Sequence, residues 1–432
     1  MTRERDSFGH PAPNVDSDPP CDDPRRHMTP LPATFTRCAY ARRCAHGVRL
    51  KDVPMRFRTS SVLGRMLAFL GAWCGNGARE TSGPRGRTRE TSRPRCVVKV
   101  VCAGVNPVDA KYLIGDKLWP WVSRKIGGTC VESLGVGFDF AGVVARADPG
   151  SGFAVGDAVF GCAEPGAGAI AEYVDVPADQ IASKAKEVSW REGASIGLCA
   201  ATMAQTLDVV KRPPKTALIV GVSGGLGHIA ARVLNAEGVR TIVGVCSQSS
   251  VQFTSEVSRN IDVVAYDDSS RSLEDALADR VATHGKFDIV IDTVTSNDAR
   301  DAACDYPNRL RPFVDDTRGR YVTFGGTPSQ WAFAIIRRCA SGADADARAS
   351  SSSLPFADRQ RSLQWVYFRG CERQLRYVVD ALGVRPIARA AYPFTNDGVR
   401  RAMDDLKSRR VKGKIVIDVD PDTIARDDPA IA

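Results

Sequence analysis

The sequence lacks an apolar run long enough to span a membrane. The best candidate, residues 62–73, is shorter than the roughly 18 residues that a spanning helix needs, and it contains Arg65. The chain also lacks a CxxC pair and a secretory signal, and its 13 cysteines are an odd number at scattered positions. These absences argue against an integral membrane protein, a structural zinc knuckle and a disulfide framework. We expect the cysteines within apolar stretches to be buried thiols in a reducing compartment: Cys102, Cys162, Cys199 and Cys246.

Acidic residues are in deficit only near the N-terminus. Residues 1–95 hold 18 Lys and Arg against 9 Asp and Glu, which accounts for the whole net charge of +9. The remainder of the 432 residues is balanced, so we do not expect nucleic acid as a partner. A hydrophobic content of 43% and a charged content of 25% are typical of globular proteins. The length suits two or three domains.

Three segments have the composition of irregular structure. Residues 1–30 are rich in Pro and Asp and are predicted to be a disordered leader. Residues 75–95 and 340–353 are of low complexity and are predicted to be an exposed linker and a loop. Residues 24–51 carry several Arg and no acid, so a mitochondrial location stays open beside the cytoplasmic one that we expect.

From Cys96 onward the sequence alternates short apolar runs with Gly and Pro. The runs between residues 96 and 185 are short and strand-like, which predicts a small, mostly β domain. A helix is expected from near Trp190 toward Val210. From residue 216, strand, glycine turn, helix and strand follow in a regular rhythm, which predicts an α/β Rossmann domain with a doubly wound parallel sheet. Residues 413–419 (GKIVIDV) predict a last strand.

A glycine-rich turn lies between the first strand and the first helix of this predicted sheet. Glycine allows a tight turn and lets the backbone approach a pyrophosphate, and the N-terminus of the following helix offers unpaired N–H groups. This context predicts dinucleotide binding, with a purely structural turn as the alternative. The candidate residues are Gly221, Val222, Ser223, Gly224, Gly225, Leu226 and Gly227.

The second strand is not followed by an acid. An NAD-preferring site usually has one there to bind both ribose hydroxyls, but no Asp or Glu lies between Glu237 and Glu256. Ser247 is able to bind a 2′-phosphate instead, which favours NADPH, although no Arg or Lys lies at 248–251. Tyr266, after the third strand, is a candidate for contact with the adenine or the 2′-phosphate. Gly325 and Gly326 end a further strand at the carboxyl edge of the sheet, where the backbone is expected to approach the cofactor.

Seven short motifs carry a family resemblance through their order. They are residues 103–111 (AGVNPVDAK), 135–143 (GVGFDFAGV), 155–161 (VGDAVFG) and 171–173 (AEY), Ala201-Thr202, the glycine turn, and 413–416 (GKIV). In this order they resemble the medium-chain dehydrogenase/reductase superfamily. The most similar branch is that of the zinc-free quinone oxidoreductases and enone reductases, including reticulon-4-interacting-protein-like members. The resemblance covers about residues 96–432, with a fainter match at 39–54.

The resemblance implies an architecture and an activity. It implies a GroES-like β domain, a Rossmann domain inserted before a C-terminal return to the β domain, and often a homodimer. It also implies NADPH-dependent reduction of quinones or α,β-unsaturated carbonyls. The expected divisions are a leader (1–30), the GroES-like domain (31–185) with an insert (55–95), the Rossmann domain (186–370), the return (371–420) and a tail (421–432).

Two residues differ from the zinc alcohol dehydrogenases to which this superfamily extends. Those enzymes have a Cys ligand where this chain has Asn106, and a His ligand where it has Phe138. Neither replacement is a usual zinc ligand, so we expect no metal. A zinc-free enzyme needs another donor for the charge that grows on the carbonyl oxygen. Asn106 is the first candidate catalytic residue, with a turn-stabilising role before Pro107 as the alternative. Lys111 is the second, with a solvated lysine as the alternative.

Three further residues are candidates for cofactor contact. The family counterpart of Thr202 approaches the nicotinamide, although a helix hydroxyl often bonds its own backbone instead. Thr293 lies in the stretch that the resemblance places near the nicotinamide. Lys414 is either a cation that faces the phosphates or a surface lysine.

These observations predict a zinc-independent oxidoreductase that uses NADPH to reduce a small quinone or α,β-unsaturated carbonyl compound. One alternative is a non-catalytic NADPH-binding adaptor whose basic leader contacts RNA or a partner protein. The other is an enoyl-thioester reductase of the same fold.

Overall fold

The computed structural model describes most of the chain after residue 30. The described residues are 31–40, 48–54, 93–111, 135–164, 166–209, 214–295, 305–324, 351–353, 361–364 and 371–428. The predicted leader, the greater part of the insert, Gly325 and Gly326 lie outside them. In the part that is described, no helix combines the length and the apolar character needed to cross a membrane. All elements below belong to the compact unit formed by residues 32–432.

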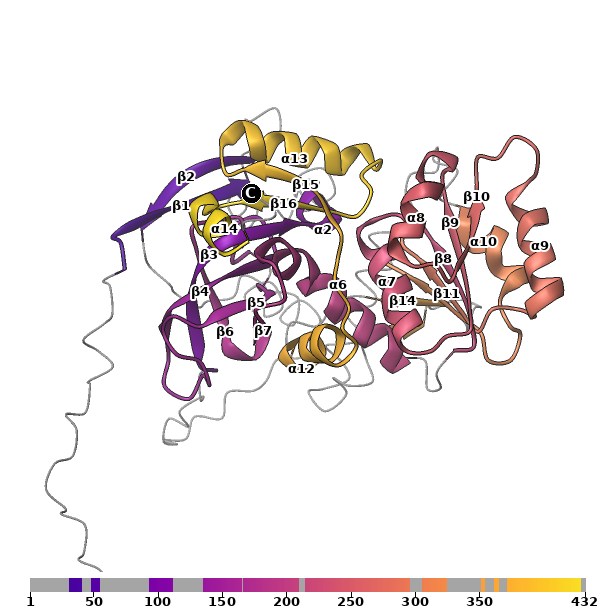
Figure 1. Cartoon of the computed structure of the whole chain (residues 1–432), viewed down its shortest axis with the longest axis horizontal. Helices are drawn as coiled ribbons and strands as arrows, with labels where there is room; N and C mark the ends of the chain where they lie inside the picture. The colour runs from indigo at the N-terminus through magenta and orange to yellow at the C-terminus, as the bar shows by residue number, and fades with distance from the viewer. Residues whose placement is uncertain are drawn as a thin grey trace, which may run out of the picture. The chain divides into compact units, whose positions relative to one another are not determined.

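The first sheet is the core of the GroES-like β domain (Figure 1). Its strands follow the order β15-β16-β3-β4-β5-β7, with β6 also paired to β3. β16 runs antiparallel to β3 and pairs Ile415 with Val105, so the last strand of the chain completes a sheet that begins some 300 residues earlier. The bounds are β3 (Arg95–Val105), β4 (Asp139–Ala147), β5 (Ala158–Cys162), β6 (Tyr173–Pro177), β7 (Ile181–Ser183), β15 (Ala388–Pro393) and β16 (Lys414–Asp418).

A hairpin from the N-terminal side packs against this domain. Strands β1 (Thr34–Tyr40) and β2 (Val48–Pro54) pair antiparallel. Cys38 donates its N–H to the carbonyl of Ile170 at 2.8 Å and accepts from the N–H of Val136 at 3.1 Å. The described residues of the faint match, 39–40 and 48–54, therefore belong to this hairpin, and Ala39 also bridges to Gly135 of the β domain.

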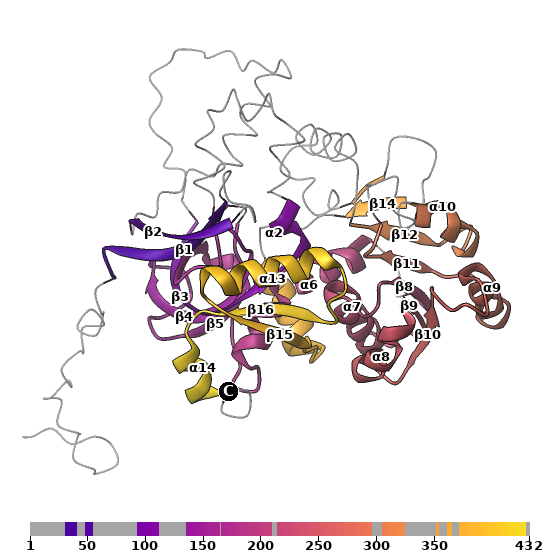
Figure 2. The ribbon, with the colours of Figure 1, turned by 90° about the horizontal axis from the view of Figure 1, so that it is seen from above.

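The second sheet is the Rossmann sheet (Figure 2). Its order is β10-β9-β8-β11-β12-β14-β13, parallel except for β13. β8 lies between β9 and β11, so the strand order reverses there, and ligands of open α/β sheets bind at such a point beyond the carboxyl ends of the strands. The bounds are β8 (Thr216–Val220), β9 (Thr241–Cys246), β10 (Ile261–Ala265), β11 (Ile289–Asp292), β12 (Arg320–Thr323), β13 (Ser351–Ser353) and β14 (Arg361–Gln364).

Helices cover both faces of the Rossmann sheet, and α6 also packs on the first sheet. Side chains alternate between the faces of β8: Ile219 belongs to the core that contains α6 and α7, and Leu218 to the core on the opposite face. The α-helical bounds are α2 (Pro107–Lys111), α6 (Trp190–Val209), α7 (Gly225–Ala236), α8 (Val251–Val257), α9 (Leu273–His284), α10 (Tyr306–Leu310), α12 (Cys371–Arg376), α13 (Asn396–Ser408) and α14 (Pro421–Asp427). A π-helical turn, η8 (Tyr377–Ala381), follows α12, and short 3₁₀ turns occupy η3 (Ala178–Gln180), η4 (Gln248–Ser250) and η6 (Arg311–Phe313).

Regular structure forms in the expected loop 340–353 and in the segment 421–432. The end of segment 340–353 forms β13, which pairs antiparallel with β14. The expected tail begins with α14, and Asp428 just beyond this helix accepts the backbone N–H of Trp190 at 2.8 Å. The Trp190 indole N–H also donates to Asp427 at 3.2 Å, while Ile424 is buried. Long-range contacts to α6, which local composition does not show, order this segment.

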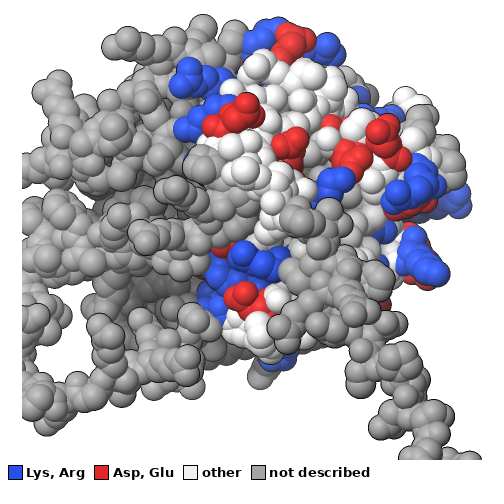
Figure 3. Space-filling model, turned by 90° about the vertical axis from the view of Figure 1, so that its left-hand side faces the viewer, with Lys and Arg blue, Asp and Glu red and all other residues white. Residues whose placement is uncertain are grey.

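The cysteines and the surface charges of the described residues can be compared with the sequence-based expectations. The apolar-stretch cysteines Cys102, Cys162, Cys199 and Cys246 are free thiols and are buried, as predicted. Burial raises the pKa of the Cys102 and Cys162 thiols well above the ordinary value, so they are protonated at neutral pH. On the face drawn in Figure 3, basic and acidic side chains lie close to one another over the described surface.

Candidate active site

The glycine turn follows β8 directly and leads into α7. Gly221 has a φ of +81°, in the left-handed region that favours glycine. Gly227 lies against the turn so closely that a Cβ there would be 2.0 Å from the carbonyl oxygen of Gly221. Gly224 is the N-cap of α7 and has no side chain to bond the first amides of that helix. The turn therefore has the shape and the free helix N-terminus that a pyrophosphate requires.

Two C-terminal segments hold this turn in place. Gly413 donates its N–H to the carbonyl of Ser223 at 2.9 Å. The His228 Nδ1 lies 2.8 Å from the carbonyl oxygen of Gly224, and its Nε2 accepts the N–H of Ile387 at 3.0 Å. Because Nε2 accepts, Nδ1 must carry the hydrogen and donate it. Burial lowers the pKa of His228 to about 4, so the ring is neutral at pH 7.

The residues expected at the adenosine end meet at the carboxyl ends of β9 and β10. The Ser247 hydroxyl lies 3.1 Å from that of Ser249 and 3.0 Å from that of Ser250. Tyr266 donates its N–H to the carbonyl of Cys246 at 3.0 Å, and its side chain is half exposed. A cation that the sequence argument missed is also present, because the Lys412 Nζ donates to the carbonyl of Ser249 at 2.6 Å. No local signal predicts this contact, since the two residues are 163 positions apart.

Thr293 and Thr202 are both fixed by hydrogen bonds to the backbone. Thr293 donates its N–H and its hydroxyl to the carbonyl of Val220, at 3.2 and 2.8 Å, which places it beside Gly221 at the end of β8. The Thr202 hydroxyl donates to the carbonyl of Leu198 at 2.7 Å, the geometry of a helix residue bonded to its own backbone. Gly325 and Gly326, the other residues predicted near the nicotinamide, lie outside the described residues.

The predicted catalytic residue Asn106 belongs to a buried polar network. Its Nδ2 donates to the Oδ2 of Asp139 at 2.9 Å, and its Oδ1 accepts from the Nζ of Lys414 at 2.6 Å. Lys414 also donates to the Oδ2 of Asp139 at 3.3 Å. The exposed fractions are 2% for Asn106, 0% for Asp139 and 3% for Lys414, so the surface-lysine alternative for Lys414 is wrong. These side chains come from three regions distant in sequence: Asn106 directly follows β3, Asp139 begins β4 and Lys414 begins β16.

Asp109 closes the loop on which Asn106 lies. Its Oδ2 accepts the N–H of Asn106 at 2.7 Å, and its own N–H donates to the carbonyl of Asn106 at 2.9 Å. Asp109 is fully buried, and burial raises the pKa of its carboxyl to about 8. The group is therefore mostly protonated at pH 7. Lys111, the second predicted catalytic residue, ends α2, and its side chain is outside the described part of the chain.

The donors in this network suit an organic site better than a zinc ion. Asn106 and the buried Phe138 are the residues that the family resemblance aligns with zinc ligands, and neither is a usual zinc ligand. The oxygens of Asn106 and Asp139 already receive the ammonium group of Lys414, whose positive charge would repel a divalent cation. Among the residues that the structure describes, no three His, Cys, Asp or Glu form a group able to hold a metal.

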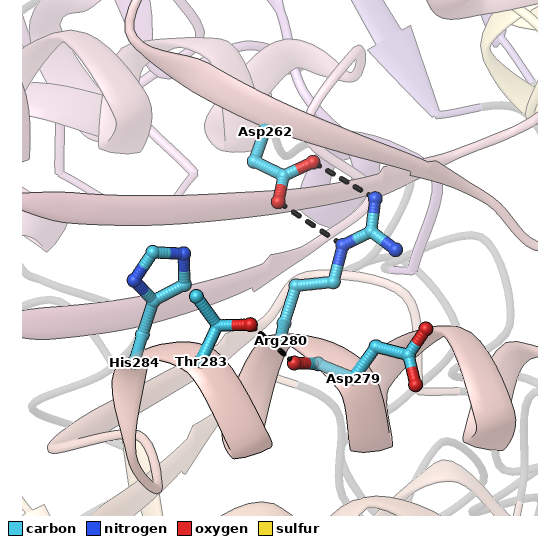
Figure 4. Close-up of a pocket in the computed structure, with 5 residues that line it drawn as sticks. All are labelled: Asp262, Asp279, Arg280, Thr283 and His284. Carbon is cyan, nitrogen blue, oxygen red and sulfur yellow. Dashed lines mark hydrogen bonds and ion pairs between the residues drawn. The ribbon is translucent and has the colours of Figure 1, made fainter.

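A hollow lies between β10 and α9 of the Rossmann domain, away from the switch point (Figure 4). It is lined by Asp262 of β10 and by Asp279, Arg280, Thr283 and His284 of α9. Asp262 is near the amino end of its strand, opposite the carboxyl edge where the glycine turn lies. The Arg280 guanidinium donates twice to Asp262, at 3.0 and 3.1 Å. Two of the charged side chains that line the hollow, Asp262 and Arg280, therefore form an ion pair with each other.

Two family profiles match the chain and decide its family. A profile described as "Alcohol dehydrogenase GroES-like domain" matches residues 93–186, and one described as "Zinc-binding dehydrogenase" matches residues 261–417. Together they cover more than half of the chain. The chain belongs to the medium-chain dehydrogenase/reductase superfamily. As a member, it is an oxidoreductase with a nicotinamide cofactor and a small-molecule substrate.

Curated relatives of this dehydrogenase/reductase include two kinds of enzyme. The protein named "NAD(P)H oxidoreductase RTN4IP1, mitochondrial" of Drosophila melanogaster is 24% identical over 357 residues, covering 76% of this chain and 80% of the relative. "Trans-enoyl reductase buaC" of Petromyces alliaceus is 33% identical over 169 residues, covering 35% of this chain and 43% of the relative.

Solved structures show the same fold. The quinone oxidoreductase from Coxiella burnetii superposes with a TM-score of 0.60 at 19% identity, covering 89% of this chain and 99% of the other. Mycobacterial Rv1454c complexed with NADPH superposes with a TM-score of 0.58 at 18% identity, covering 89% and 100%. The predicted combination of a GroES-like domain and a Rossmann sheet is confirmed.

Proposed function

We propose that this dehydrogenase/reductase is a zinc-independent enzyme that transfers hydride from NADPH to a quinone or an α,β-unsaturated carbonyl compound. The observation that carries the proposal is the buried network of Asn106, Asp139 and Lys414. It brings the amide of Asn106, which the family resemblance aligns with a zinc ligand, together with the ammonium group of Lys414. The names of a quinone oxidoreductase of the same fold and of a trans-enoyl reductase relative support the substrate class.

The residues of this chain would stabilise charge and orient the reactants. A bound reduced nicotinamide supplies the hydride. The Asn106 amide has two hydrogens, and Asp139 accepts one of them. We assign the second to the substrate carbonyl oxygen, where negative charge grows during hydride transfer. Lys111 ends α2, the helix that follows Asn106, and we assign it to the ribose or the substrate.

The remaining predicted residues would bind the cofactor. We assign the pyrophosphate to the turn from Gly221 through Ser223, Gly224, Gly225 and Leu226 to Gly227. Thr202, Thr293, Gly325 and Gly326 are assigned to the nicotinamide side. Ser247 and Tyr266 are assigned to the adenosine side, where Lys412 supplies the positive charge that residues 248–251 lack. A hydroxyl cluster beside a lysine favours a 2′-phosphate, and hence NADPH over NADH.

Replacing Lys412 is expected to weaken NADPH binding selectively. In Lys412→Gln, the Kd of NADPH should rise about tenfold or more, because a charge-assisted contact contributes about 1.5–3 kcal/mol. The Kd of NADH should stay within about twofold. Fluorescence titration of both nucleotides measures the ratio, with Lys407→Gln at the exposed end of α13 as the control. Equal weakening of both nucleotides would remove Lys412 from 2′-phosphate recognition.

The activity is tested by NADPH oxidation with quinones, enones and enoyl thioesters after exhaustive treatment with a chelator. We expect turnover of a quinone or an enone, unchanged by the chelator and slower with NADH. Turnover of enoyl thioesters alone would support the second candidate, which the trans-enoyl reductase relative favours. A chain that binds NADPH no tighter than millimolar would end the proposal.

The location and assembly are proposed on separate grounds. The fruit-fly relative is named as mitochondrial, which supports the mitochondrial alternative left open by residues 24–51. A cytoplasmic location and a homodimer stay predictions, to be checked by cell fractionation and by light scattering.

A further inference from the structure

We infer that Lys414 and Asp139 are positioning residues that set the orientation of the Asn106 amide and link it to the phosphate-binding turn. The inference rests on the proposed function, since it assumes that Asn106 acts on the substrate. It assigns to Lys414 a role through another side chain in place of direct phosphate contact.

The chemistry of the network permits one orientation of the amide. An ammonium group only donates hydrogen bonds, and Lys414 lies 2.6 Å from the Asn106 oxygen. An ionised carboxylate only accepts, and Asp139 lies 2.9 Å from the amide nitrogen. A flipped amide would place a donor against a donor and an acceptor against an acceptor. The two charged groups therefore determine where the second amide hydrogen points.

The same lysine lies against the turn that is to bind the pyrophosphate. A Cβ at Gly225 would be 3.1 Å from the Cδ of Lys414, so the lysine stem packs on the first turn of α7. The neighbouring Gly413 donates to the carbonyl of Ser223. A two-residue segment at the start of β16 thus contacts both the turn and the amide. A movement of the turn on cofactor binding would therefore be transmitted to Asn106 through Gly413 and Lys414.

Asp139 is fixed from a second direction. Its Oδ1 accepts the N–H of Leu198 at 2.5 Å, within α6. The Lys414 Nζ also lies 3.7 Å from the Sγ of Cys199, on the same helix. The network is therefore held by contacts with α6, β16 and the Asn106 loop.

A double-mutant cycle in the rate of hydride transfer tests the inference. At saturating NADPH, with the best substrate from the panel, Asn106→Ala should slow transfer by about 100-fold. Lys414→Met should slow it about tenfold or more. If Lys414 acts through the amide, the double variant should be no slower than Asn106→Ala alone. A double variant as slow as the product of the two effects would overturn the inference.

Two additions keep the test decisive. Lys414→Met leaves the Asp139 carboxylate without its cation, so the cycle is repeated with Lys414→Met/Asp139→Asn, which removes both charges. Lys184→Met is the matched control, because Lys184 is a half-buried lysine that contacts Val188 and Trp190 away from the network. Its effect should multiply with that of Asn106→Ala. The Kd of NADPH is measured on every variant. A wild type that does not bind NADPH would refute the proposed function. Normal NADPH binding with independent effects of the Lys414 and Asn106 substitutions would refute only this inference.

Discussion

Asp109→Asn is expected to make the protein more stable than the wild type at pH 8, by of the order of 5 kcal/mol. The buried Asp109 carboxyl has a pKa raised to about 8, against 3.8 in its ordinary state. Each pKa unit corresponds to about 1.4 kcal/mol. Asn is similar in shape and keeps an oxygen to accept the N–H of Asn106, but it has no charge to bury.

The sign follows from proton binding. Between pH 3.8 and about 8 the folded state holds the Asp109 proton more tightly than the unfolded state does. The contribution of this group is therefore fully present below pH 3.8 and is lost as the pH rises through about 8. The stability difference between variant and wild type should be near zero at pH 4, grow up to about pH 8 and then level off.

Urea unfolding at a series of pH values measures this difference. The neutral His228 acts in the opposite sense, since its pKa of about 4 means that stability is lost as the pH falls below 6.5. Both proteins contain His228, so its contribution cancels. The exposed Asp208→Asn on α6 is the control for replacing a carboxylate by an amide at the surface. A gain for Asp109→Asn that is equal at all pH values would contradict the buried-carboxyl argument.

Gly227→Ala is expected to weaken NADPH binding by about 100-fold or more. Its Cβ would lie 2.0 Å from the Gly221 oxygen and 2.7 Å from the Gly221 carbonyl carbon, both of them backbone atoms that no rotamer change can move. α7 must therefore shift from the end of β8, and the amides assigned to the pyrophosphate move with it. Fluorescence titration measures binding, and thermal unfolding without cofactor measures the stability lost.

Gly398→Ala provides a control with a comparable clash outside the turn. A Cβ at Gly398 would lie 2.1 Å from the carbonyl oxygen of Pro393, at the start of α13. This variant should lose about 1–3 kcal/mol of stability, as overpacked sites do, but should bind NADPH with unchanged affinity when folded. NADPH binding by Gly227→Ala at the wild-type level would show that the turn does not hold the phosphates.

The local pattern of apolar residues and glycines was sufficient to predict much of the fold. The apolar runs predicted β8, β9 and β11 because β-branched residues bounded by glycine favour buried strands, and these strands confirm the doubly wound sheet. Gly221, Ser247 and Thr293 directly follow β8, β9 and β11, and they lie on one side of the sheet because parallel strands share a carboxyl edge. The helix α14 lies in the segment 421–432, and Asp428 just beyond it bonds the backbone of Trp190, a contact that composition does not reveal.

The Rossmann architecture and the glycine turn follow from the sequence alone, because they depend on the chemistry of neighbouring residues. The contacts of two lysines do not follow from it, because their partners are far away along the chain. Lys414 contacts Asn106 across 308 positions, and Lys412 contacts Ser249 across 163. A buried ammonium group is stable only beside the acceptors that folding brings to it, and no local pattern specifies which acceptors those are.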